Sequence, residues 1–158
     1  MTTVNRIWVD ADACPGPVKE ILYRTAERLR LPVVLVANQA LQVPASRWVS
    51  SRQVTRGLDA ADDYIVEAVG DGELVITADI PLAAQLLDKS ARVITPRGER
   101  YTAENIRQRL NMRDFMDVMR GAGAMTGGPA AFSQRDRQNF ANALDQLLTS
   151  CGTPRERG

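Results

Sequence analysis

Short apolar runs alternate with stretches of helical periodicity through the first hundred residues. The runs predict five strands, at residues 6–9, 33–37, 49–54, 74–77 and 92–94. The segments between them predict helices at residues 17–30, 58–69 and 81–89. The run Val33–Ala37 is continuous rather than alternating, which indicates a sheet that is covered on both faces. Strands that alternate with helices predict an α/β fold with a doubly wound, mostly parallel five-stranded sheet in the order 3-2-1-4-5.

The last third of the chain has helical patterns only. Thr102 is a good N-cap for a helix that reaches about residue 120, and a glycine-rich connection follows at 121–129. Ser133 and Asp136 have the spacing of a capping box at the start of a final helix. We therefore predict one domain over residues 1–150, with 101–150 as its helical extension, and a disordered polar tail over 151–158.

Composition excludes several kinds of chemistry. The chain has no histidine, which removes a Ser-His-Asp arrangement and the commonest transition-metal ligand. The two cysteines, Cys14 and Cys151, lie far apart, which is typical of reduced thiols in a cytoplasmic protein. Without a histidine to activate it, Cys14 is better interpreted as a packing residue than as a nucleophile. No run approaches the length of a membrane span, and no signal-peptide layout is present.

Charge is distributed unevenly along the chain. Residues 1–90 carry nine basic and twelve acidic side chains, whereas residues 91–158 carry eleven and seven. Eighteen of the twenty basic residues are arginine, the side chain suited to bidentate phosphate contacts. An acidic front half and a basic back half fit a metal site beside a phosphate-binding surface.

Aspartates follow two of the predicted strands. Asp10 and Asp12 end the first strand, and Asp79 follows the fourth. In the predicted order these strands are neighbours, and the winding reverses between them, so that their ends flank the crevice where such folds bind ligands. The helix at 58–69 starts at the same edge and adds three more acids, Asp59, Asp62 and Asp63. Carboxylates held together repel one another unless a cation relieves them, and oxygen ligands alone favour Mg²⁺ or Mn²⁺.

A structural interpretation of each acid stays open. An aspartate at the end of a strand often caps the next helix, and Asp59 has the position of such an N-cap. Acids in the first helical turn, such as Asp62, stabilise the helix dipole. An arginine taken singly is usually a solvated surface residue.

Five segments together resemble the YaiI/YqxD family of bacterial proteins, which is grouped with PIN-like domains. Asp10, Asp62 and the pair Thr77/Asp79 also match the wider PIN pattern. The segments are Val9–Pro15, Asp59–Ile65, Thr77–Ala83, Pro96–Gly98 and Gly127–Phe132.

The resemblance implies a Mg²⁺- or Mn²⁺-dependent nuclease whose partner is nucleic acid, with RNA favoured over DNA. Asp10 and Asp79 would hold the metal directly, and Asp62 and Asp12 would be further ligands or would position water. Backbone phosphates would be met by three arginines, Arg97, Arg100 and Arg135.

Two other classes of function remain open. A haloacid-dehalogenase-type phosphatase would use Asp10 as nucleophile and Asp12 as acid/base, but it needs a lysine near the phosphate. Lys19 and Lys89 are poorly placed for that role, since one lies in the helix just after the motif and the other ends a helix at the far side of the sheet. The second alternative is a nucleic-acid-binding module without catalysis.

Overall fold

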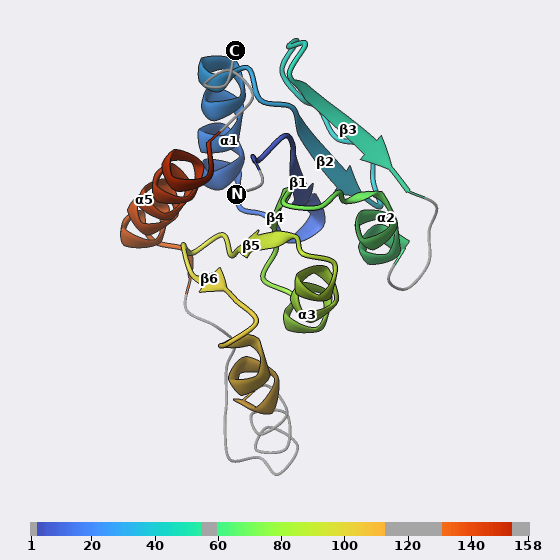
Figure 1. Ribbon diagram of the computed structural model, residues 1–158. Coiled ribbons are helices and arrows are strands. Elements are labelled where there is room, and N and C mark those ends of the chain that lie inside the picture. Colours follow the sequence, from blue (N-terminus) through green and yellow to red (C-terminus); the bar gives the residue numbers. More distant parts are fainter. Residues whose placement is uncertain (1–2, 55–59, 113–130, 153–158) are drawn as a thin grey trace.

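The computed structural model describes residues 3–54, 60–112 and 131–152, and these form a single six-stranded sheet between two layers of helices (Figure 1). The strand order is β3-β2-β1-β4-β5-β6. All neighbouring strands are parallel except β5 and β6, which are antiparallel. The strands are β1 (Ile7–Asp10), β2 (Val33–Ala37), β3 (Val49–Gln53), β4 (Leu74–Ile76), β5 (Arg92–Ile94) and β6 (Arg100–Tyr101).

Two pairs of helices cover the two faces of the sheet. One face packs against α1 (Gly16–Leu29) and α5 (Gln134–Cys151), and the other against α2 (Ala60–Ala68) and α3 (Ile80–Asp88) (Figure 1). Residues along each strand alternate between the two cores, as Ile7 and Val9 do on one face and Trp8 on the other. All five residues of β2 are buried. This confirms the prediction of a doubly wound, mostly parallel sheet covered on both faces.

The sheet has one strand more than the sequence predicted. After β5 the chain turns at Gly98, whose φ is +89°, and returns as the two-residue strand β6. A Cβ at Gly98 would lie 2.5 Å from the carbonyl carbon of Asn139 in α5. The turn therefore packs directly on the backbone of α5, and only glycine fits there.

The C-terminal helices begin at the predicted caps. Ser133 and Asp136 form the reciprocal capping box that starts α5. Thr102 Oγ1 accepts a hydrogen bond from the backbone N–H of Asn105 at 3.1 Å, and residues 106–112 are helical. The rest of the helix predicted to residue 120 and the connection at 121–129 lie outside the described residues.

The last helix ends one residue after the predicted domain boundary at residue 150. Cys151 is the last residue of α5, because apolar side chains such as Leu147 and Leu148 hold this end of the helix on the core; residues 153–158 lie outside the described part of the chain. Among the described helices, none is long and apolar enough to cross a membrane.

Candidate functional site

The parallel pairing of β1 with β4 brings Asp10 next to Thr77. Val9 lies opposite Ile76, so β1 and β4 end at the same level of the sheet. Thr77, which is almost fully buried, donates its hydroxyl hydrogen to Asp10 Oδ2 at 3.0 Å. The same hydroxyl oxygen accepts a hydrogen bond from the backbone N–H of Asp79 at 3.1 Å. One buried hydroxyl thus joins the two strand ends.

Asp79 has a structural role in addition to its position at this edge. It is the N-cap of α3, and its Oδ1 accepts a hydrogen bond from the backbone N–H of Leu82 at 2.9 Å. The capping interpretation therefore holds for this acid. It does not hold for Asp10 or Asp12, because α1 begins after Pro15 and has no side-chain cap.

Asp12 lies one turn beyond Asp10, in the short 3-10 helix η1 (Ala11–Ala13) that follows β1. Its Oδ2 accepts a hydrogen bond from the backbone N–H of Asn38 at 2.9 Å. Asn38 directly follows β2, so this contact ties the ends of β1 and β2 together. The Asp12 side chain is otherwise exposed at the carboxyl edge of the sheet.

Of the aspartates at this edge, Asp10 is the one whose surroundings disfavour its negative charge. Burial raises its pKa above the ordinary value, and the carboxylates of Asp79 and Asp12 raise it further, against the hydrogen bond from Thr77, which lowers it. Removing water disfavours the charged carboxylate, and neighbouring negative charges do the same. A cation near Asp10 would therefore be favoured.

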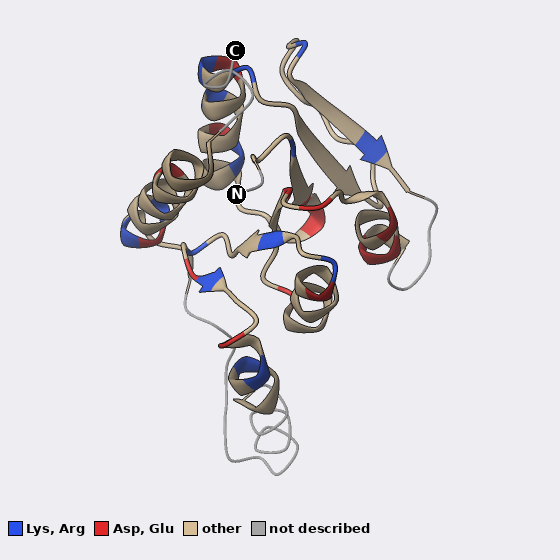
Figure 2. Ribbon diagram, in the orientation of Figure 1, with Lys and Arg blue, Asp and Glu red and all other residues tan. Residues whose placement is uncertain are grey.

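The aspartates do not by themselves form a closed metal cage. Asp62 lies with Asp63 in the first turn of α2, and Asp59 lies outside the described residues. Among the residues that the structure describes, no group of three or more acidic or cysteine side chains could hold a metal ion. Figure 2 shows acidic segments where β1 ends and on α2, with basic segments on β5, β6 and α5.

An open magnesium site nevertheless fits the donors present. Mg²⁺ usually keeps several waters and is bound through one or two carboxylates together with substrate phosphates. Asp10 Oδ1 and Asp79 Oδ2 have no hydrogen-bond partner within the described residues. Each acid therefore offers one oxygen while its other oxygen is held by the protein.

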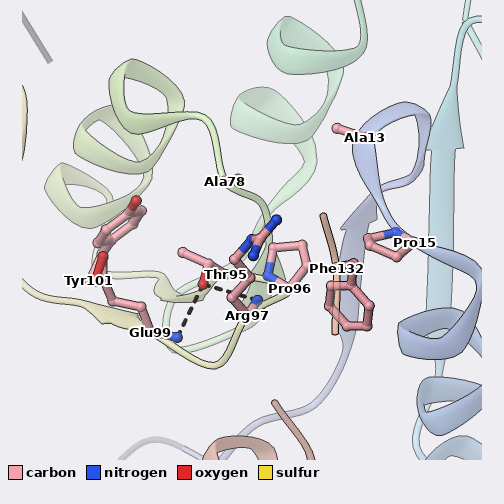
Figure 3. A pocket seen from close by; sticks show the side chains of 9 residues that line it. All are labelled: Ala13, Pro15, Ala78, Thr95, Pro96, Arg97, Glu99, Tyr101 and Phe132. Carbon is pink, nitrogen blue, oxygen red and sulfur yellow. Dashed lines mark hydrogen bonds between the residues drawn. The ribbon is translucent and has the colours of Figure 1, made fainter. Parts of the chain in front are cut away.

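A cavity of about 370 Å³ adjoins this edge (Figure 3). Its wall includes Ala13, the residue after Asp12, and Ala78, the residue between Thr77 and Asp79. The remaining lining residues come from the β5–β6 hairpin, the start of α1 and the segment before α5; they are Pro15, Thr95, Pro96, Arg97, Glu99, Tyr101 and Phe132. The volume falls in the usual range of small-ligand sites, about 300–1,000 Å³.

The three predicted phosphate-binding arginines occupy different places. Arg97 lines the cavity, and its Nη1 is 2.9 Å from Asp136 Oδ2. Arg100 is exposed on β6 beside Gln146 and Ser150 of α5, where it lines a separate hollow. Arg135 is exposed in the first turn of α5. The backbone N–H of Ser133, aided by Arg97 and Arg135, holds the pKa of Asp136 below its usual range. Of the three, only Arg97 lines the cavity.

Cys14 and Lys89 have structural surroundings. Cys14 is buried in the core beside α1, and burial raises the pKa of its thiol to about 12, so it is a packing residue at neutral pH. Lys89 Nζ donates to the carbonyl of Val66 in α2, at the end of α3 opposite to Asp79. A phosphatase lysine is therefore not supplied by Lys89.

Sequence reasoning missed two residues of this region. The sequence does not indicate Tyr101, because its pattern does not predict β6 and a lone tyrosine after an arginine carries no motif. Phe132 stands in the sequence only as the last residue of one segment that resembles the YaiI/YqxD family. The apolar Pro15, Pro96 and Phe132 come from three distant segments, and no periodicity links them.

The fold is thus that of a doubly wound α/β protein, with its acids and its cavity at the carboxyl edge where ligands of such folds bind. The chain belongs to the family described as "Uncharacterized BCR, YaiI/YqxD family", whose model matches residues 8–150.

Bacterial relatives match over nearly the whole chain. A UPF0178 protein of Hahella chejuensis is 62% identical over 143 residues, which are 90% of this chain and 95% of that protein. A UPF0178 protein of Alkalilimnicola ehrlichii is 62% identical over 144 residues, 91% and 97% of the two chains. A third, from Bordetella petrii, is 63% identical over 142 residues, 90% and 95% of the two chains. No solved structure matches significantly.

Proposed function

We propose that this chain is a Mg²⁺- or Mn²⁺-dependent phosphodiesterase that cleaves nucleic acid, with RNA preferred to DNA. One observation carries the proposal. Asp10 is a half-buried carboxylate with a raised pKa, it is fixed by Thr77 at the carboxyl end of β1, and two further carboxylates act on it. Such strain at a ligand-binding edge is typical of a functional group. The match of Asp10, Asp62 and Thr77/Asp79 to the PIN pattern supports the same class of reaction.

Each residue has a defined task in this proposal. Asp10 and Asp79 hold the cation through the oxygens that the protein leaves open. A bound cation would lower the pKa of a water and offset the charge of the phosphate. Thr77 keeps both carboxylates oriented, because its hydroxyl bonds to the side chain of one and to the backbone of the other.

Two acids and one arginine complete the site. Asp12, anchored by Asn38, and Asp62, at the start of α2, would position water or add ligands once substrate is bound. Arg97 is the arginine placed to meet a backbone phosphate, because it lines the cavity beside the acids. Arg97 also pairs with Asp136, and that ion pair is exposed, so a phosphate would compete with it at little cost.

Turnover of single-stranded RNA tests the proposal. We expect cleavage in Mg²⁺ or Mn²⁺, loss of cleavage in chelator, and loss by at least about a hundredfold in Asp10→Asn, since the variant removes the charged ligand. Asp88→Asn is the matched control, because Asp88 is an exposed acid at the opposite end of α3 and its variant should cleave normally. Equal rates for wild type and Asp10→Asn, or equal rates with and without chelator, would contradict the proposal.

Two other experimental results would favour a different function over that of a nuclease. RNA binding without turnover on any substrate would favour a non-catalytic binding module. Trapping of an aspartyl-phosphate analogue on Asp10 would favour the phosphatase.

A further inference from the structure

The cavity beside the acids has two chemically different ends. At one end lie the rings of Phe132, Pro15 and Pro96 (Figure 3). Phe132 is half-buried and packs on the core with its remaining surface toward the cavity. Flat and apolar walls of this kind suit a planar aromatic ring, which stacks on side-chain rings.

The other end is polar and carries Glu99 and Tyr101 (Figure 3). Tyr101 lines it, with only 6% of its surface exposed. The charge of Asp79 acts on this tyrosine. Its hydroxyl has no hydrogen-bond partner among the described residues, although nearly all buried polar groups have one. A ligand oxygen in the cavity would supply that partner.

The hydroxyl would act as a donor. Burial raises the pKa of Tyr101, and the negative charges of Glu99 and Asp79 raise it further against Arg109, which lowers it, so the group stays protonated at neutral pH. Arg97 lies between the two ends in Figure 3 and adds a positive charge. A ligand that matches this order has an aromatic ring, then an anionic oxygen that faces Arg97 and Tyr101.

We propose that the cavity binds one nucleotide unit of single-stranded RNA, its base against Phe132 and its phosphate against Arg97 and the Tyr101 hydroxyl. The substrate is single-stranded because a paired base cannot enter a cavity without leaving its stack. The proposal rests on the proposed function in taking nucleic acid as substrate. It adds the place of the base and the residues that receive it.

Binding of small ligands separates the two ends. The experiment uses the full chain with Asp10→Asn, in chelator, so that no hydrolysis occurs, and follows titrations by NMR. The three probes are adenosine 5′-monophosphate, adenosine and ribose 5-phosphate. We expect the nucleotide to bind more tightly than either fragment, because it alone reaches both ends.

Two substitutions should have opposite patterns. Phe132→Leu should weaken binding of the nucleotide and of adenosine by about 5- to 150-fold, the range of one base–aromatic stack, and leave ribose 5-phosphate unchanged. Tyr101→Phe should weaken the nucleotide and ribose 5-phosphate by about tenfold and leave adenosine unchanged, because one hydrogen bond to a charged oxygen is lost. Tyr23→Leu is the control, since Tyr23 is a half-buried aromatic on the same core that lines a different hollow.

A conservative variant guards against misfolding. Phe132→Trp keeps a flat ring and should retain adenosine binding. If Phe132→Trp folds yet loses adenosine binding as Phe132→Leu does, or if either variant affects all three probes equally or none, the nucleotide site is overturned. Hydrolysis is measured separately on the wild type with Mg²⁺. The expected binding pattern without hydrolysis would overturn only the proposed function, and hydrolysis without the pattern would overturn only the nucleotide site.

Discussion

Thr77 donates its hydroxyl hydrogen to Asp10 across a sequence separation of 67 residues. The bond joins the ends of the two strands at which the winding of the sheet reverses, and the same oxygen receives the backbone N–H of Asp79. One threonine thus couples the carboxylate with the raised pKa to the helix cap beside it. The stability of this edge of the sheet and its response to a cation should depend on these two hydrogen bonds, and each residue can be tested by substitution.

Thr77→Val should destabilise the protein. The change keeps the shape of the side chain but removes one hydrogen bond to Asp10 and one from Asp79, and each buried group left unpaired costs about 1–3 kcal/mol. Thr77→Ser keeps both bonds and serves as the control. Urea unfolding of the three proteins gives the comparison, and equal midpoints for wild type and Thr77→Val would contradict the coupling.

Asp10→Asn should make the metal-free protein more stable at neutral pH. The folded-state pKa of Asp10 is raised above the ordinary value of 3.8. A raised carboxyl pKa contributes stability that is fully present below pH 3.8 and is lost as the pH rises through the folded-state value. Asparagine does not titrate and can still accept from Thr77. The gain of the variant over wild type should therefore disappear at the lowest pH.

Unfolding free energies of wild type and Asp10→Asn, measured in chelator from acid to neutral pH, test whether the variant is the more stable protein at neutral pH. Asp88→Asn controls for the simple loss of one negative charge, because Asp88 is exposed. A variant that is less stable than wild type at neutral pH and equally stable in acid would show that Asp10 forms a stabilising charged contact instead.

Asp79 should respond differently to asparagine and alanine. Asp79→Ala removes the cap of α3 and should cost about 1 kcal/mol, whereas Asp79→Asn can still accept from Leu82 and should be nearly neutral in chelator. Both variants should lose the stabilisation by Mg²⁺, which at a hundredfold excess over the dissociation constant is about 2.7 kcal/mol. Thermal melts with chelator and with Mg²⁺ separate the two roles. An unchanged Mg²⁺ response in Asp79→Asn would leave this residue with its capping role alone.

Arg97 and Arg100 should differ in their effect on RNA binding. Each phosphate contact to a single strand contributes about 0.7 to the slope of log affinity against log salt. Arg97→Ala should reduce that slope by one contact's worth, because Arg97 lines the cavity, while Arg100→Ala should leave it unchanged, because Arg100 lines a separate hollow on α5. The same slope for Arg97→Ala and wild type would show that Arg97 makes no contact with a phosphate of the bound RNA.

Gly98→Ala should disrupt the hairpin that carries one wall of the cavity. The positive φ alone costs a residue with a Cβ about 1–3 kcal/mol, and the added atom would also meet the backbone of Asn139. We expect a lower melting temperature together with weaker binding of the nucleotide probe. Gly16→Ala is the control, because a Cβ there meets nothing within 4 Å. Equal melting temperatures for the two variants would contradict the close packing of turn and helix.

The amino-acid sequence determined the elements whose signal is local. The continuous apolar run Val33–Ala37 predicted a strand buried on both faces, and the capping box at Ser133 and Asp136 predicted the start of α5. The strand order followed because βαβ units permit few topologies, and that order placed Asp10 and Asp79 at one edge.

Only the tertiary structure determined the features that depend on the distance between separate segments of the chain. β6 has two residues and exists because Gly98 lets the hairpin pack on α5, which no short-range pattern records. The carboxylates share an edge, yet whether three of them approach closely depends on how far α2 lies from β1, and spacing along the chain cannot supply that distance. The hydroxyl of Tyr101, which has no hydrogen-bond partner among the described residues, and the ring of Phe132 come together only because the hairpin and the segment before α5 meet at one cavity.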